Sequence, residues 1–482
     1  MGINITTVQF AAFMLQLSGS YSYPMDYRVQ VRPDDPRLIG HPMLAKPDWK
    51  RRAVPLMIWG DGGAFTRAGN SIMLLCVAFM LMGDLSRESV FPVSLFCKFN
   101  RARGSVHGVG NDAWDRIWKY AVHGLNALFD GYHPLKDPWD NEWSVGSRQW
   151  ELAGEPIANG LFFGVMWVAT WDQDYGSNEL GLDHYNGNKI CCWCPANRSN
   201  YNFRDVSKNA PYKKLHYKPG PADVRVSVHE IWGIRGLTRF HYSGDEMHAS
   251  ALGVLLDLHG SAIADAVDSD IGFIHGGTYA QRVDIVWADI HRRCREQNVA
   301  KTMSVITATM LGKQGKFPCL RAKAAESKSL VTPMLSFLLE KAPNTMHWKH
   351  VKGCYRNIAI FYEVIVGAGH VLSDEQADRV VRAIDRFMLH FNSLTNLASD
   401  RGIPRYNFTG KLHVLYHIAE FARFLNPRMT WTYQFEDFMG HMIKLGHACS
   451  LGTPGHLIPA KMMQHYMLIL SHLVHGDFAW QA

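Results

Sequence analysis

Apolar residues are grouped in short blocks along the first third of the chain, and these blocks predict buried strands. The run 53–60 (AVPLMIWG) is almost entirely apolar and stops at Asp61, which two glycines follow, as at the end of a buried strand with a turn behind it. Three later runs predict further strands, at 71–82, 88–99 and 161–170. Asp172 closes the last of these runs, as Asp61 closes the first.

Between the third and fourth runs, the apolar residues take on the period of a helix. They recur at i+3 and i+4 spacing, at Trp114, Ile117, Trp118, Ala121, Leu125 and Leu128. Helical periodicity dominates again from 245 to 425, and two further amphipathic stretches follow near the C-terminus.

Three strands, a helix and a fourth strand make up the element order of a ribonuclease-H-like core. We therefore expect an α/β fold with such a mixed-sheet core, a Cys-containing loop insert and a large α-helical insertion. In that fold the first and fourth strands are adjacent and parallel, so Asp61 and Asp172 would converge. The main alternative, a doubly wound nucleotide-binding fold, requires a glycine-rich phosphate loop that enters a helix, and the spacing after residue 60 does not provide one.

Composition narrows the classes of protein. The chain has 482 residues with 47% hydrophobic and 19% charged residues, which excludes a mostly disordered protein. The net charge of +7 is compatible with a polyanionic partner. The longest apolar run, 71–82, is too short for a membrane span, and an odd number of cysteines, 9, favours a reducing compartment over a disulfide scaffold.

Two chemistries can be assigned to particular residues. Carboxylates that converge at strand ends are suitable ligands for Mg²⁺ or Mn²⁺, and a pair of such ions can act on a phosphodiester. The alternative is that Asp61 caps a turn and Asp172 is a solvated loop acid. Cys191 and Cys194 have the CxxC spacing of two thiolates on one Zn²⁺, with His184 as the expected third ligand. The fourth ligand stays open among His216, His229, Cys192 and a distant residue, and a redox pair or two buried thiols are the alternatives to zinc.

Asp245 and His248 open a helical stretch and lie on one face of it, where Asp245 is either an N-cap or part of a site. Basic residues are frequent in three segments and suit phosphate contacts or a solvated face. They are Lys208, Lys213, Lys214 and Lys218, then Arg292, Arg293 and Arg295, then Lys313, Lys316, Arg321 and Lys323.

Four stretches, in this order and spacing, resemble the transposases of CACTA (En/Spm-like) cut-and-paste elements, in particular the transposon-derived proteins of dinoflagellates. They are DGG after a strand, WDQDYGSNELGLDHY, CCWCPANRS and GDEMHASALGVLLDLHGS. The resemblance extends from about 50 to about 450. It implies a ribonuclease-H-like catalytic domain with a triad of acids, a CxxC motif and an acid-x-x-His motif.

Within this resemblance, Asp61 matches the first acid and Asp172 the second, with Asp174 as the alternative. Cys191 and Cys194 match the CxxC, and Asp245 and His248 match the acid-x-x-His. The third acid would be Glu436, at the start of a late amphipathic helix, with Glu326 as an earlier alternative.

The resemblance implies a DNA transposase or a transposase-derived nuclease that cleaves phosphodiesters and transfers strands in the nucleus. Its partners would be transposon ends and target DNA, with no membrane, and a homo-oligomer is compatible with the family. One alternative is a catalytically inactive, domesticated DNA-binding zinc protein. Another is an unrelated α/β metabolic enzyme, which would need an apolar pocket away from these acids.

These patterns together divide the chain into five parts. They are an irregular N-terminal arm (1–50), the first part of the core (51–175), a zinc-binding loop insert with a return strand (176–244), a mainly helical region (245–425) and C-terminal helices that complete the core (426–482).

Overall fold

The computed structural model describes residues 31–66, 69–80, 90–98, 112–180, 182–183, 187–214, 229–300, 302–312 and 315–475. The chain is a mixed α/β protein and divides into two compact units that alternate along the sequence. The first unit contains Met1–Leu182, Lys218–Ser243 and Thr432–Ala482, and the second contains Asp183–Tyr217 and Gly244–Trp431.

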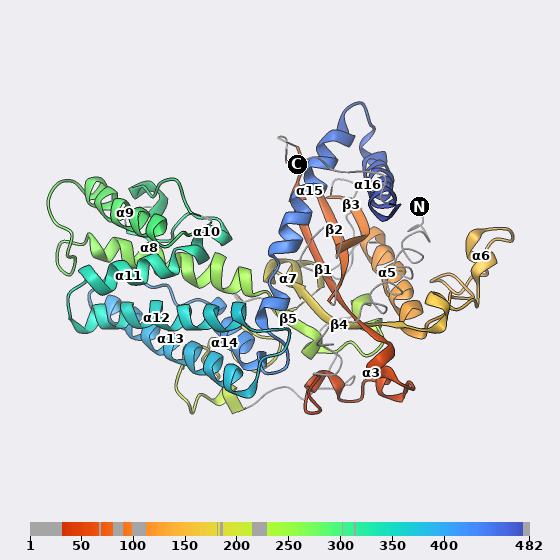
Figure 1. Ribbon diagram of the computed structural model, residues 1–482, viewed down its shortest axis with the longest axis horizontal. Helices are drawn as coiled ribbons and strands as arrows, with labels where there is room; N and C mark the ends of the chain where they lie inside the picture. The colour runs from red at the N-terminus through yellow and green to blue at the C-terminus, as the bar shows by residue number, and fades with distance from the viewer. Residues whose placement is uncertain are drawn as a thin grey trace. The chain divides into compact units, whose positions relative to one another are not determined.

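The first unit is built on an open five-stranded mixed sheet (Figure 1). Its strands are β1 (Ala53–Ala64), β2 (Ser71–Phe79), β3 (Val90–Cys97), β4 (Phe163–Trp171) and β5 (Tyr242–Gly244), in the order β3-β2-β1-β4-β5. β2 is antiparallel to both β1 and β3, whereas β1 and β4 are parallel. All four apolar runs thus contain strands, and the first and fourth lie side by side and parallel, as predicted.

The centre of the sheet is buried on both faces, which explains why its strands are continuously apolar instead of alternating. Every residue of β4 and the first eight residues of β1 are buried. The predicted helix is α5 (Asp112–Asp130), which packs against β4. Gly164 permits this close approach, since a Cβ there would lie 2.9 Å from Leu56 Cδ1 and 3.2 Å from Leu128 Cβ.

Two C-terminal helices complete the first unit. α15 (Tyr433–Ser450) packs against β1, where Trp59 stacks on Phe435 with 5.1 Å between ring centroids. α16 (Ile458–His475) packs against β3, and the hydroxyl of Tyr466 donates to the carbonyl of Val90. The remaining α-helices of the unit are α3 (Trp49–Arg52), α6 (Arg148–Leu152) and α7 (Gln173–Leu180).

The second unit is helical, apart from the loop segment that carries the cysteine cluster. Its regular helices are α8 (Leu255–Ala266), α9 (Tyr279–Glu296), α10 (Ala324–Ser329), α11 (Val331–Lys341), α12 (Met346–Gly367), α13 (Asp374–Asp400) and α14 (Gly410–Phe421). The π-helix η9 (Met247–Val254) precedes α8. Among the described helices, none has both the length and the apolar character that crossing a membrane requires.

Candidate metal centre and acidic site

Four side chains of the second unit come together as a candidate metal centre: Cys191, Cys194, His413 and His417. One potential ligand atom from each lies within 4.8 Å of those of the others. Both cysteines belong to a short loop that is closed by a hydrogen bond from the Ile190 amide to the Ala196 carbonyl. Both histidines belong to α14, where their i, i+4 spacing places them on one face of the helix.

The distances suit a tetrahedral ion. Cys194 Sγ lies 3.3 Å from Nε2 of His413 and 3.3 Å from Nε2 of His417, and the two Nε2 atoms are 3.2 Å apart. A zinc ion with Zn–S bonds of about 2.3 Å and Zn–N bonds of about 2.0 Å needs ligand separations of about 3.3–3.8 Å. Two thiols and two imidazoles are also the donor set that selects zinc over Mg²⁺. The four residues could therefore hold a metal ion such as zinc.

The centre is closed to solvent. Both histidines are fully buried, and the two cysteines are at most 2% exposed. Burial raises the pKa of Cys191, whereas the hydrogen bonds from Cys191, His413 and His417 lower the pKa of Cys194. Burial lowers the pKa of His413, but in His417 the bonds to Cys194 and Glu420 outweigh burial and raise the pKa to about 9. A thiolate is thus favoured at Cys194, as metal ligation requires.

The surroundings orient the ligands. His417 Nδ1 lies 3.0 Å from Glu420 Oε2, an arrangement in which a carboxylate fixes the orientation and tautomer of a metal-binding imidazole. Trp193, between the two cysteines, is 1% exposed and lies against His417 and Phe421. Its ring therefore shields the centre from solvent.

His413 and His417 complete a possible set of four ligands with the CxxC, so both partners in this set are distant in sequence from the cysteines. His184 and His216 lie outside the described residues. His229 lies in the first unit, where its ring packs edge-on against Trp118. The sequence does contain an H-x₃-H pair, HVLYH at 413–417, which is a spacing typical of metal ligands. This pair begins 219 residues after Cys194, so nothing in the sequence links it to the cysteines.

The candidate acidic site lies at the carboxyl ends of β1 and β4. The parallel pairing ends with Trp59 opposite Thr170, and the same register continued by two residues brings Asp61 level with Asp172. Asp61 is half-buried, and its Oδ1 accepts a hydrogen bond from the Gly62 amide at 2.6 Å. The strand topology therefore brings together the two ends that carry these acids, as the sequence predicted.

Asp172 has a local structural role as well. Its Oδ1 accepts the amide of Tyr175 at 2.6 Å, and its carbonyl accepts that of Gly176, so Asp172 caps the N-terminus of α7. It is half-buried, whereas the alternative second acid, Asp174, is exposed within the first turn of the helix.

Glu436 lies in the first turn of α15, the helix that packs along β1. The preceding residue, Phe435, stacks on Trp59, and farther along the helix Ile443 lies against Gly63, where a Cβ would be 2.7 Å from Ile443 Cδ1. Glu436 therefore belongs to the element that flanks the strand end of Asp61, and it is half-buried there. Within the described residues, the Cys/His centre is the one group of three or more possible ligands with all their ligand atoms inside 4.8 Å, so these acids do not form such a group.

The other predicted site residues lie in the second unit. Asp245 is 3% exposed, accepts the amide of Met247 at 2.9 Å and is hydrogen-bonded to His248 Nδ1. It is thus both a cap and the partner of the histidine. Glu326 caps α10, since its Oε2 accepts the amide of Lys323 at 2.8 Å.

The predicted basic segments differ from one another in what surrounds their charges. Arg292 and Arg293 pair with Asp289, Glu296 and Glu340, and Lys213 pairs with Asp385. Arg295, Arg321 and Lys323 are exposed. Cations that already pair with an acid of the second unit are less suited to phosphate contacts than cations for which no such pair is found among the described residues.

No protein-family model matches the chain, and a search of curated proteins also finds no match.

Proposed function

We propose that the protein is a metal-dependent DNA transposase, or a nuclease derived from one, with a ribonuclease-H-like core that acts in the nucleus. The observation that supports this proposal is the sheet order β3-β2-β1-β4-β5, with β1 and β4 parallel, so that the two strand ends next to Asp61 and Asp172 are neighbours. Helix α15, which carries Glu436, also packs against β1. Mixed sheets occur in proteins of many functions, so the proposed activity depends on the acids at the strand ends and not on the fold alone.

In this proposal, Asp61, Asp172 and Glu436 hold two Mg²⁺ or Mn²⁺ ions. Such ions would activate a water or a DNA 3′-hydroxyl and stabilise the leaving oxygen of the phosphodiester. Two metal ions in such a site lie about 3.5–4 Å apart. Their carboxylate ligands contact the ions from different sides, so the ligand oxygens do not all need to be within 4.8 Å of one another.

Zinc, in contrast, is proposed as a structural ion held by Cys191, Cys194, His413 and His417. All four positions are protein ligands and all are buried, which leaves no open position for a substrate. The ion would tie the cysteine loop to helix α14. Asp245 would orient His248, whose acid-x-x-His motif the resemblance places among the functional residues.

Mn²⁺-dependent nicking of terminal-repeat DNA tests the proposal. Asp61→Asn, Asp172→Asn and Glu436→Gln should each reduce nicking by at least 100-fold while leaving the fold intact. Asn is as good an N-cap as Asp, so Asp172→Asn removes the charge but keeps the start of α7. Asp437→Asn is a matched control, because it removes an exposed acid next to a proposed ligand.

Nicking at the wild-type rate by all three variants would refute the acid triad. The chain would then be better described by the second candidate, a non-catalytic DNA-binding zinc protein. One observation favours that candidate: among the described residues, the Cys/His centre has all its possible ligand atoms within 4.8 Å of one another, whereas the acids do not form such a group.

A further inference from the structure

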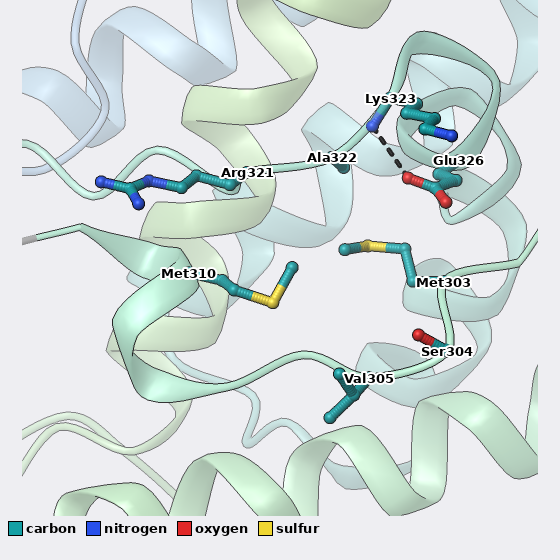
Figure 2. A pocket seen from close by; sticks show the side chains of 8 residues that line it. All are labelled: Met303, Ser304, Val305, Met310, Arg321, Ala322, Lys323 and Glu326. Carbon is teal, nitrogen blue, oxygen red and sulfur yellow. Dashed lines mark hydrogen bonds between the residues drawn. The ribbon is translucent and has the colours of Figure 1, made fainter. Parts of the chain in front are cut away.

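A pocket of about 410 Å³ opens on the second unit between the segments 303–310 and 321–326 (Figure 2). The two segments are joined by a hydrogen bond from the Arg321 amide to the Met310 carbonyl at 2.9 Å. The side chains of Met303 and Met310 turn toward each other at its centre, and Val305 lies beside them. The centre of the pocket is therefore apolar and suits an aromatic ring, because thioether sulfurs make favourable contacts with such rings.

The polar groups of the pocket are arranged around this apolar centre. The Glu326 carboxylate faces it, with Oε2 held by the Lys323 amide, and among the described residues Oε1 accepts no hydrogen bond (Figure 2). The side chains of Arg321 and Lys323 leave the rim on opposite sides, and both are exposed. One hydrogen-bond acceptor inside and two cations at the rim match a ring with N–H donors that is flanked by negative charges.

A second hollow of about 390 Å³ lies on the preceding stretch of chain, between Cys294 and Thr302, and it carries a further exposed cation, Arg295. Each of the two hollows therefore has at least one exposed cation, which suits a polyanionic strand because its charges repeat along its length.

We infer that the pocket between Met303 and Met310 binds one unstacked nucleotide of a single DNA strand. The base would lie against the Met310 thioether with an amino group toward Glu326, and its flanking phosphates would contact Arg321 and Lys323. Carboxylates accept hydrogen bonds from the exocyclic amino group of cytosine, which thymine lacks. The inference rests on the proposed action on DNA and adds that the helical unit holds DNA in an unpaired form.

The test is the affinity of the full chain, with zinc but without Mg²⁺ or Mn²⁺, for fluorescent eight-residue oligonucleotides of deoxycytidine and of thymidine over a series of salt concentrations. The wild type should bind the cytosine strand about 10-fold more tightly, as expected of one hydrogen bond to a charged acceptor. Glu326→Gln should remove most of this preference, while its amide oxygen can still accept the Lys323 amide.

The rim and the centre should respond differently. Arg321→Ala and Lys323→Ala should each lower the slope of log affinity against log salt by roughly 0.7, the value for one phosphate contact on a single strand. Met310→Ala should weaken binding by roughly 2- to 12-fold without a change of slope, because a sulfur–ring contact carries no net charge. Lys349→Ala, which removes an exposed lysine of α12 outside the pocket, should have neither effect.

Wild-type affinity, slope and base preference in all the pocket variants would overturn the inference, as would a wild type that does not bind single strands. A protein that nicks duplex DNA but gives this result would keep the proposed function and lose the pocket. A protein that shows the predicted pocket effects but no nicking would keep the pocket and lose the proposed catalysis.

Discussion

Replacing Glu420 should weaken zinc binding although Glu420 is not itself a ligand. Its Oε2 lies 3.0 Å from Nδ1 of His417, and Nε2 of the same ring lies 3.3 Å from Cys194 Sγ. When a metal ion displaces the proton from Nε2, the proton that stays on Nδ1 is shared with the carboxylate. This sharing makes Nε2 more basic, so the carboxylate strengthens the metal–nitrogen bond.

The expected size follows from the contact. Loss of an outer carboxylate partner lowers metal affinity by about 10- to 100-fold, which corresponds to about 1.4–2.7 kcal/mol. Glu420→Gln retains an acceptor for Nδ1 but removes the charge, so we expect a loss near 10-fold. Glu420→Ala removes the acceptor as well and should approach 100-fold.

Competition for zinc with a chromogenic chelator at pH 7 measures these affinities in the purified full chain. Glu363→Gln is the matched control, because Glu363 forms an exposed ion pair with Arg379 away from the metal centre. Equal zinc affinity in the wild type and in both Glu420 variants would refute the argument that the carboxylate supports the ligand. Well under one zinc per chain in the wild type would refute the site itself.

Three further outcomes are expected. Burial raises the pKa of Glu246 to about 7, above its ordinary 4.5, so the folded state binds the proton more tightly. The contribution of Glu246 to stability should therefore fall as pH rises from about 4.5 to about 7. Glu246→Gln does not titrate, so its free energy of unfolding relative to the wild type should increase by up to about 3 kcal/mol between pH 4 and pH 8, as measured by chemical unfolding. An unchanged difference between the two pH values would contradict this. Asp172→Ala should lose about 1 kcal/mol of stability with the α7 cap, whereas Asp172→Asn should lose little, and equal melting temperatures of the two variants would argue against the cap. Trp59→Ala should cost about 3–5 kcal/mol in denaturant unfolding, because Trp59 is 1% exposed and stacks on Phe435, and a loss below 1 kcal/mol would contradict that packing.

The sequence by itself determined the elements whose burial is local. The continuous apolar run 53–60 became β1 because both of its faces are covered, and the i+3, i+4 pattern after residue 112 became α5. The CxxC spacing also identified half of the metal centre, since two thiolates three residues apart already fit one ion.

The tertiary structure decided how these pieces are combined. His413 and His417 form an H-x₃-H pair in the sequence, but any helix face can carry that spacing. Only the packing of α14 against the cysteine loop shows which cysteines the pair accompanies. The pairing of Arg293 with Glu340 depends in the same way on two helices far apart in sequence. Periodicity reports which face of a segment is buried, whereas a ligand set or an ion pair depends on which distant segment covers that face. The packing of the whole chain makes that choice.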